Sequence, residues 1–361
     1  MGGNTRNYDL QAAKQDQADA PVLCYRPPTP RQPHRIGLIG CGGISESHLK
    51  AYRHAGFQVV ALADVVERLA VARRDAFYPD AAVYADYRKL LSEEDIDTVD
   101  IATHPEERVP IIEDALRSGR HVLSQKPFVL DIAAGHRLAT LADQCGCRLA
   151  VNQNGRWAPH LSYLREAVRV GLIGDVVGVT ITIHWDHNWI AGTPFDSMHH
   201  VVLQDFAIHW FDFAASVLPG LPERVLATVM RSPSQSASPP LVAGVLMEYR
   251  DARVSLTFDA DTRYGPEDRT VVRGTRGTLY SVGPDLTDQQ VTGFTEKGWF
   301  RPELEGTWFL EGFQGTMAEL LCASEEERPP LNDARDNLRG LSICFAAIRS
   351  ADQGAPVSVQ G

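Results

Sequence analysis

The segment from Arg35 to Ser45, which reads RIGLIGCGGIS, constrains the fold of this chain more than any other. Its apolar residues 36–39 indicate a buried strand, and a glycine-rich turn and residues at helical spacing follow. A strand, a glycine turn and a helix are the context in which a G-x-G-x-x-G sequence binds a dinucleotide. Gly40 would allow the sharp turn, and Gly42 would let a pyrophosphate approach the helix N-terminus. Ser45 replaces the third glycine, so an ordinary strand–helix turn is the alternative interpretation. The predicted cofactor contacts in the turn are Gly40, Cys41, Gly42, Gly43 and Ile44.

An acidic residue at the end of the next apolar segment supports the dinucleotide interpretation. Asp64 follows residues 58–63 and lies 24 positions after Gly40. A carboxylate at that place accepts hydrogen bonds from the adenosine ribose, and its charge repels a 2′-phosphate. Arg68 is the first arginine after it, four positions away. We therefore expect NAD as the cofactor, with NADP as the alternative. A helix N-cap is the alternative role for Asp64.

Strand-like and helix-like segments alternate up to about residue 155, which predicts a parallel sheet covered by helices on both faces. The expected helices span 66–77, 86–91, 107–118 and 132–145, and the expected strands span 98–102, 121–125 and 148–152. Ligands of such sheets bind beyond the carboxyl ends of the strands. The residues that we expect to meet the cofactor there are Thr103, His104, Gln125, Lys126 and Asn154.

The pattern changes after about residue 155. A helix is expected at 159–170, and strands at 177–183, 224–230, 242–249, 253–259, 270–274 and 278–282. Helices at 310–323 and 334–350 close the chain. Neighbouring strands without intervening helices favour an antiparallel or mixed sheet. We therefore divide the α/β chain into a polar, Pro-rich extension (1–34), a dinucleotide-binding domain (35–155) and an α/β domain with a large open, mainly antiparallel sheet (156–361). The extension is either a disordered tail or an arm laid along a surface.

Composition excludes several classes of protein. The formal net charge is −11 at pH 7, which argues against nucleic acid or an anionic membrane as a partner. The chain has no apolar run long enough to span a bilayer, and its N-terminal residues lack an apolar signal core. Its six cysteines include no C-x-x-C pair, so we expect reduced thiols in a cytoplasmic enzyme.

Three polar residues on one apolar helix form the best candidate for chemistry. Asp205, His209 and Asp212 have the spacing of one helix face, and histidine is a suitable general base near neutral pH. A structural His–Asp hydrogen bond is the alternative. Lys126, which Pro127 holds extended, is a second candidate at a strand end, although a solvated lysine is the simpler interpretation.

Residues 184–189, HWDHNW, and the later pair His199 and His200 carry metal-capable side chains. Their spacing matches no known ligand set, and one strand cannot direct His184 and His187 to the same side, so we expect no metal. Tryptophan beside polar groups suits a sugar ring instead, because its apolar face stacks on aromatics. His184 and Asp186 are therefore predicted substrate contacts.

Several motifs follow one another in a characteristic order. They are GCGGI at 40–44, Asp64, IAT at 101–103 with Pro105, AL-x-x-GRHVL-x-QKP at 115–127, NQN-x-RW-x-P at 152–159, GLIG at 171–174, D-x-x-x-H-x-x-D at 205–212 and GT-x-GTL at 274–279. In this order they resemble the Gfo/Idh/MocA family of oxidoreductases, named for glucose–fructose oxidoreductase and inositol dehydrogenase. The resemblance runs from about Arg35 to Val359.

The resemblance implies a Rossmann domain, a bound nicotinamide cofactor and hydride transfer at a ring carbinol of a sugar, glycoside or cyclitol. By resemblance, Lys126 is the lysine of the family's Glu-Lys-Pro motif, His209 its catalytic histidine and Asp205 its substrate-binding aspartate. The matching motif also assigns Arg156 and Trp157 to the substrate. Gln125 replaces the usual glutamate, and Arg108 stands where many members have histidine, so the substrate stays open. A lyase or hydrolase with tightly bound NAD and a non-catalytic regulatory protein are the alternatives.

Assembly can also be predicted from the strand at 177–183. Val177, Val179, Ile181 and Ile183 form one apolar face, and the opposite face is weakly polar and uncharged. Helices covering only one side of the sheet would leave a broad face in water, and such faces often mark an interface. We expect a homodimer or a tetramer built from dimers, which many members of the family form. The arm at 21–34 could reach a neighbouring subunit.

Overall fold

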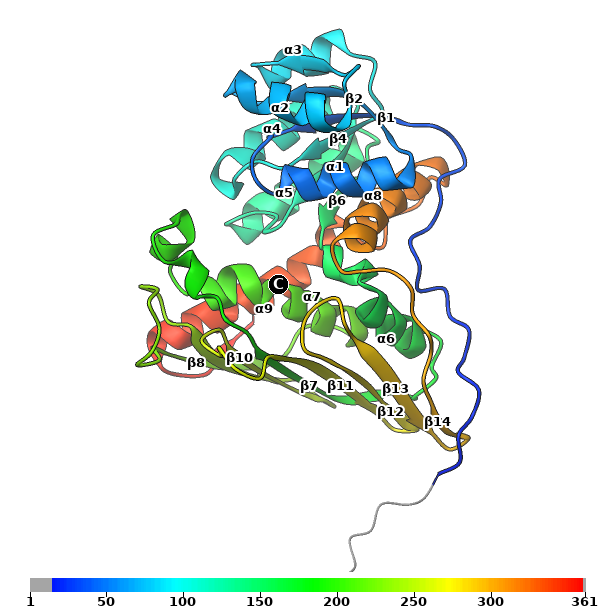
Figure 1. Ribbon diagram of the computed structural model, residues 1–361, viewed down its shortest axis with the longest axis vertical. Coiled ribbons are helices and arrows are strands. Elements are labelled where there is room, and N and C mark those ends of the chain that lie inside the picture. Colours follow the sequence, from blue (N-terminus) through cyan, green and yellow to red (C-terminus); the bar gives the residue numbers. More distant parts are fainter. Residues whose placement is uncertain (1–14, 360–361) are drawn as a thin grey trace, which may run out of the picture.

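The computed structural model describes residues 15–359 and contains two sheets with helices packed against them (Figure 1). The first is a six-stranded parallel sheet with the order β3-β2-β1-β4-β5-β6. Its strands are β1 (Arg35–Ile39), β2 (Gln58–Ala63), β3 (Ala82–Tyr84), β4 (Thr98–Ile101), β5 (His121–Gln125) and β6 (Leu149–Asn152). The predicted Rossmann sheet is confirmed. Only the edge strand β3 was not expected, because it has three residues and all of them are half-buried.

Two groups of helices cover this sheet. One face packs against α1 (Ser45–Ala55), α2 (Glu67–Phe77) and α8 (Leu310–Glu325), and the other against α3 (Tyr87–Glu93), α4 (Pro105–Arg117), α5 (Ile132–Gln144) and part of α9 (Ala334–Gln353). Within β1, Ile36 and Leu38 face the first group and Ile39 faces the second. Since α8 and α9 come from the far end of the chain, the C-terminal residues complete the core of the first sheet. The predicted domain boundaries stay a prediction.

The second sheet has nine strands in the order β14-β13-β12-β11-β7-β10-β9-β8-β15. Its strands are β7 (Val176–His184), β8 (Arg224–Met230), β9 (Val242–Glu248), β10 (Arg253–Asp259), β11 (Glu267–Gly274), β12 (Gly277–Gly283), β13 (Gln290–Thr295), β14 (Gly298–Phe300) and β15 (Val357–Ser358). Only the β7–β10 pair is parallel, so the expected mainly antiparallel sheet is confirmed. The strands β13 to β15 were not expected because they are short or interrupted by glycine.

Helices lie on one face of the second sheet, and its other face is bare (Figure 1). Val179, Ile181 and Ile183 of β7 are buried under α6 (Pro159–Arg169), α7 (Ile208–Val217) and α9, while Thr180 and Thr182 alternate with them on the open face. Val177 does not join the buried side as predicted, since 42% of it is exposed. The register of β7 against β11 shifts at this end, which breaks the alternation.

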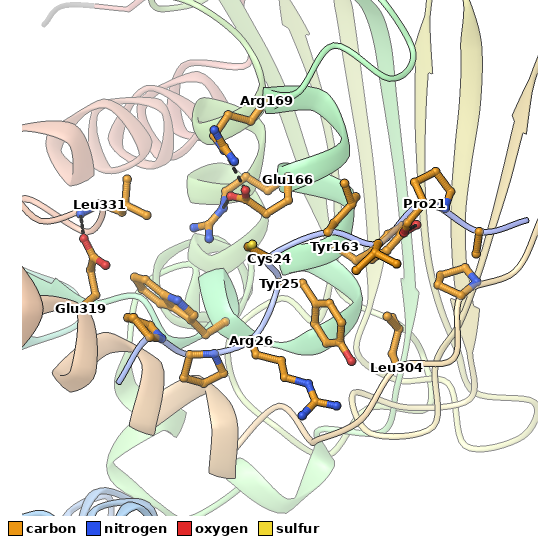
Figure 2. Close-up of a pocket in the computed structure, with 18 of the residues that line it drawn as sticks. Pro21, Cys24, Tyr25, Arg26, Tyr163, Glu166, Arg169, Leu304, Glu319 and Leu331 are labelled. Carbon is orange, nitrogen blue, oxygen red and sulfur yellow. Dashed lines mark hydrogen bonds and ion pairs between the residues drawn. The ribbon is translucent and has the colours of Figure 1, made fainter. Parts of the chain in front are cut away.

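The described part of the N-terminal extension, residues 15–34, is an arm that lies along its own chain (Figure 1). Gln17 bridges to Trp299 of the edge strand β14, and the Tyr163 hydroxyl donates to the Pro21 carbonyl at 2.9 Å. The arm and α6 line a cavity of about 970 Å³ (Figure 2). Residues 1–14, the rest of the predicted extension, fall outside the described residues.

Two expectations from composition concern the helices and the cysteines. Among residues 15–359, no helix combines the length and the apolar character that crossing a membrane requires. All six cysteines lie in the described part of the chain, and all are free thiols. The expectation of reduced thiols stays a prediction.

Candidate active site

The glycine turn between β1 and α1 lies against the carboxyl end of β4. Gly40 has a φ of +96°, a left-handed conformation that glycine adopts at little cost. A Cβ at Gly40 would lie 2.8 Å from the carbonyl carbon of Ala102 and the nitrogen of Thr103, so a side chain would force the strand ends apart. A Cβ at Gly42 or Gly43 would meet no atom within 4 Å. The outer side of the turn is therefore open space, which fits the close approach of a pyrophosphate.

Asp64, at the end of β2, holds this turn from the side. Its Oδ2 accepts a hydrogen bond from the Cys41 N–H at 2.7 Å, and its Oδ1 accepts one from the Val66 N–H at 2.8 Å. The N-cap position of α2 is Val66, so the alternative role of Asp64 as a helix cap does not apply. A carboxylate has further lone pairs, which remain for ribose hydroxyls.

A buried arginine joins the carboxyl ends of β4 and β5. The guanidinium of Arg108 donates to the carbonyls of Thr103, Gln125 and Pro127. Burial lowers the pKa of Arg108 to about 9, which leaves it charged at neutral pH. Thr103 Oγ1 is buried with no hydrogen-bond partner among the described residues. An unpartnered hydroxyl at a strand end is a group that a cofactor would satisfy.

A buried polar network supports Gln125 from beneath. Gln125 Oε1 accepts from the Lys126 N–H at 2.9 Å and from Asn152 Nδ2 at 3.0 Å. Asn152 Nδ2 also lies 3.2 Å from His48 Nε2, and His48 Nδ1 lies 2.7 Å from Asp100 Oδ2. With Oε1 used in this way, the amide nitrogen of Gln125 is left for a ligand. A glutamate here would present a negative charge in place of this neutral donor.

Lys126, Asp205 and His209 come together above this strand end. Lys126 Nζ donates to Asp205 Oδ1 at 2.8 Å and to the Asp205 carbonyl at 3.0 Å, and both side chains are 16% exposed. Asp205 lies in a π-helical turn, η4 (Val202–Phe206), and His209 lies in the first turn of α7. Burial, and secondarily the positive charge of Lys126, hold the pKa of His209 well below its usual value. The imidazole is therefore neutral at pH 7.

Aromatic residues from distant segments surround His209 and Asp205. The ring of Trp308, in the loop before α8, lies 5.4 Å from the His209 ring. The ring of His187 lies 4.2 Å from Phe206, the neighbour of Asp205, and burial lowers the pKa of His187 to about 4. Trp308 is only 2% exposed and packs behind His209, whereas His187 and Phe206 are half-buried and form an aromatic surface of the kind on which a ring substrate stacks.

Comparison with known proteins identifies the family of this chain. Residues 34–153 match a model described as an oxidoreductase family with an NAD-binding Rossmann fold, and residues 161–280 match the GFO/IDH/MocA C-terminal domain. The two matches follow in the order of the two sheets and together cover most of the chain. This chain belongs to the GFO/IDH/MocA family of oxidoreductases.

Named relatives in this family span nearly the whole chain. A D-apiose dehydrogenase from Paraburkholderia graminis is 28% identical over 90% of this chain and 89% of its own length. An inositol 2-dehydrogenase from Rhizobium meliloti is 25% identical over 90% of this chain and 99% of its own length. The crystal structure of an Agrobacterium radiobacter oxidoreductase in complex with NAD⁺, L-tartaric acid and magnesium has a TM-score of 0.81 at 20% identity and covers 91% of this chain and 98% of that one. At this identity it supports the fold alone.

The structure does not bring Arg156 to the group around Lys126. Its Nε and Nη2 pair with the two carboxylate oxygens of Asp212 at 2.7 Å, and Nη2 also contacts Asp336 at 2.7 Å. The side chains of Arg156 and Asp212 are only 4% and 3% exposed. The sequence placed Asp212 on one stripe with Asp205 and His209. In the structure Asp205 pairs with Lys126, whereas Asp212 pairs with Arg156. Arg156 is corrected from a substrate contact to an internal ion-pair partner, because its donors are already used.

Three further predicted substrate contacts also lie elsewhere. Trp157 is 2% exposed, packs beneath the guanidinium of Arg165 at 5.2 Å and lines the cavity under the arm. His184 follows the buried Ile183 on β7, so it points to the open face of the sheet, away from α7. Asp186 is exposed and accepts from the Asn188 N–H at 3.0 Å. The structure places none of the three beside Lys126.

Two predicted cofactor contacts, His104 and Asn154, differ in burial. His104 is exposed at the N-cap of α4, next to Thr103. Asn154 is buried, and its carbonyl packs against Gly312 of α8; Asn152, two positions earlier, is the residue that bonds to Gln125. Asn152 ends β6, whereas Asn154 lies in the turn η1 (Asn154–Trp157), so strand alternation does not carry over from one to the other.

The structure also adds residues that the sequence had not singled out. Arg73 of α2 donates to the Gly42 carbonyl at 3.2 Å and to Glu46 at 2.9 Å, whereas the sequence drew attention only to Arg68. Trp308 packs against His209, and His187, which the sequence analysis considered only as a metal-capable side chain, packs against Phe206. No spacing rule could have found them, because they reach the site through the packing of separate segments.

Proposed function

We propose that this chain is an NAD-dependent dehydrogenase that transfers a hydride between nicotinamide and a ring carbinol of a sugar, glycoside or cyclitol. The observation that carries the proposal is the Lys126–Asp205 ion pair beside a neutral His209, at the carboxyl edge of the Rossmann sheet. The family is described as NAD-binding oxidoreductases, and its named relatives include D-apiose and inositol dehydrogenases.

In this proposal the open glycine turn would hold the cofactor. Gly40 to Ile44 would contact its pyrophosphate, Asp64 would accept hydrogen bonds from the adenosine ribose, and Thr103 and Gln125 would meet the nicotinamide half. The unpartnered Thr103 hydroxyl and the empty space over Gly42 and Gly43 support this arrangement. The bound nicotinamide supplies the hydride acceptor or donor. A structural neighbour was crystallised with NAD⁺, which agrees with the choice.

The chain's own residues handle the proton and the orientation of the substrate. During oxidation His209 accepts the hydroxyl proton, because its lowered pKa keeps the imidazole neutral. The Lys126 ammonium donates to the same oxygen and stabilises the negative charge that develops there. Asp205 fixes the position of Lys126 Nζ and has a second oxygen free to accept from a neighbouring substrate hydroxyl. The half-buried rings of His187 and Phe206 would contact the apolar face of the substrate ring.

The test is to replace each of the two central residues. His209→Ala and Lys126→Ala should each lower kcat/KM for polyol oxidation by about 10²- to 10⁴-fold, the range for a positioned acid–base group. NAD affinity should change little. His136→Ala, which removes an exposed histidine of α5, is the matched control and should keep full activity. Near-normal turnover by a folded His209→Ala or Lys126→Ala variant would refute the assignment.

The same assay separates the proposal from a lyase or hydrolase that keeps its cofactor. Absorbance at about 340 nm follows NADH, and an alternative enzyme with tightly bound NAD would turn over steadily without added NAD. We expect one NADH released for each polyol oxidised. Turnover without NADH release would favour the lyase or hydrolase.

A further inference from the structure

A second cluster of polar side chains lies outside the proposed active site. His199 and His200 precede η4, and Asp352 lies in the last turn of α9, more than 150 positions later in the chain. The Nε2 atoms of both histidines lie 2.8 Å from the same atom, Asp352 Oδ1. The two imidazole rings face each other with their centroids 3.9 Å apart. Two nitrogens and one carboxylate oxygen therefore converge on one point.

This donor set suits a divalent transition metal. Imidazole nitrogen and carboxylate oxygen are common Zn²⁺ ligands, and catalytic and exchangeable sites often use three protein ligands with water as the fourth. One ligand atom from each residue lies within 4.8 Å of the others. Tetrahedral Zn²⁺ with bonds of about 2.0–2.1 Å needs ligand atoms about 3.3 Å apart. Each of the two Nε2–Oδ1 distances of 2.8 Å would therefore need to lengthen by only about half an ångström to admit the ion.

The surroundings also favour a cation. Asp352 belongs to the C-terminal turn of a 20-residue helix, where the helix dipole places partial negative charge. His199 is 68% and Asp352 46% exposed at the side chain, so an ion has access and water can complete the coordination. His200 is only 7% exposed and anchors the cluster to the protein.

We propose that His199, His200 and Asp352 form a Zn²⁺-binding site, separate from the nucleotide site. The metal would join the end of α9 to the start of η4. The His200 carbonyl accepts from the Leu203 N–H at 2.9 Å and from the Gln204 N–H at 3.0 Å, and η4 carries Asp205. Metal binding therefore stabilises the helical turn that presents Asp205 to Lys126; this consequence, unlike the site itself, rests on the proposed function.

Zinc titration of the full-length, tag-free protein tests the site directly. After removal of metal with a chelator, calorimetric titration with ZnCl₂ should give one Zn²⁺ per chain with micromolar affinity or better. His199→Ala and Asp352→Asn should each weaken binding at least about tenfold, as loss of a ligand does. Both positions are exposed, so folding should be unaffected. His54→Ala, an exposed histidine of α1, is the matched control and should bind as the wild type does.

Two further measurements do not depend on enzyme activity. Co²⁺ at the site should give the visible absorption of a tetrahedral ion, and His199→Ala should abolish it. Zn²⁺ should slow amide hydrogen exchange at residues 201–206 in the wild type and leave the Asp352→Asn variant unchanged. The proposal is overturned if the wild type binds no Zn²⁺, or if both ligand variants bind it as tightly as His54→Ala. Neither result would bear on the dehydrogenase assignment, which the His209 and Lys126 variants test.

Discussion

Lowering the pH should destabilise this protein through one buried histidine, His160 of α6. His160 is 3% exposed, its ring lies 5.9 Å from Trp308, and its Nε2 has no hydrogen-bond partner among the described residues. Burial lowers its pKa from 6.5 to about 3. The folded chain therefore resists a proton that the unfolded chain accepts below pH 6.5. Because the folded-state pKa is depressed, stability is highest above the unfolded pKa and falls as the pH drops from 6.5 toward 3.

The size of the effect follows from the two pKa values. At pH 5 an unfolded histidine with a pKa near 6.5 is almost fully protonated, while His160 in the folded chain is still neutral. The unfolded-state pKa lies about 1.5 units above pH 5. At about 1.4 kcal/mol for each unit, protonation of the unfolded chain lowers the free energy of unfolding by about 2 kcal/mol. At pH 7, protonation of the same histidine in the unfolded chain lowers the free energy of unfolding by only about 0.2 kcal/mol. The pH change should therefore cost about 2 kcal/mol through His160 alone.

Urea denaturation at pH 7 and pH 5 measures this contribution. His160→Leu removes the titrating group and keeps a side chain of similar size, so its loss of stability between the two pH values should be about 2 kcal/mol smaller than that of the wild type. His54→Ala should lose as much as the wild type, since this side chain is exposed in the folded chain. Equal losses in the wild type and His160→Leu would show that His160 does not stay neutral in the folded protein.

Two other expectations can be tested with standard measurements. Asp64 should make kcat/KM higher with NAD than with NADP, because its carboxylate beside the Cys41 N–H would repel a 2′-phosphate. Asp64→Ala should reduce this preference. A tenfold preference of the wild type for NADP would contradict the prediction. Light scattering at micromolar concentration should report a dimer or tetramer, because helices cover only one side of the nine-stranded sheet and leave its other face broad and bare. A mass near 39.8 kDa would exclude assembly. Unchanged assembly after deletion of residues 1–30 would exclude a role for the arm in it.

Local patterns in the sequence were sufficient for most of the regular structure. The strands β5, β8 and β10 have the predicted bounds, since continuous or alternating apolar residues mark a buried strand wherever it lies in the fold. The turn at Gly40 and the acid at Asp64 were also predictable, because strand, turn and helix follow one another directly along the chain. Short edge strands such as β14 were not predicted, because three residues at a sheet edge are too few to show an alternating or continuous apolar pattern.

The partners of the polar residues could not be predicted in this way. Helical spacing places both Asp205 and Asp212 on the face of His209, yet one pairs with Lys126 and the other with Arg156. The π-helical turn before α7 and the position of the neighbouring cations determine this choice. Periodicity predicts which face of a helix is polar, but not which charge lies opposite.

The sequence by itself determined the Rossmann sheet and the glycine turn, and through resemblance it predicted Lys126 and His209 as catalytic residues. Tertiary structure alone decided that Arg108 ties two strand ends together, that Trp308 faces His209, and that Asp352 meets His199 and His200. The physical reason is the range of the interactions. Secondary structure follows from contacts between residues that are close in sequence. A site joins side chains that can be far apart in sequence, and the packing of the two sheets and their helices sets how close they lie in space.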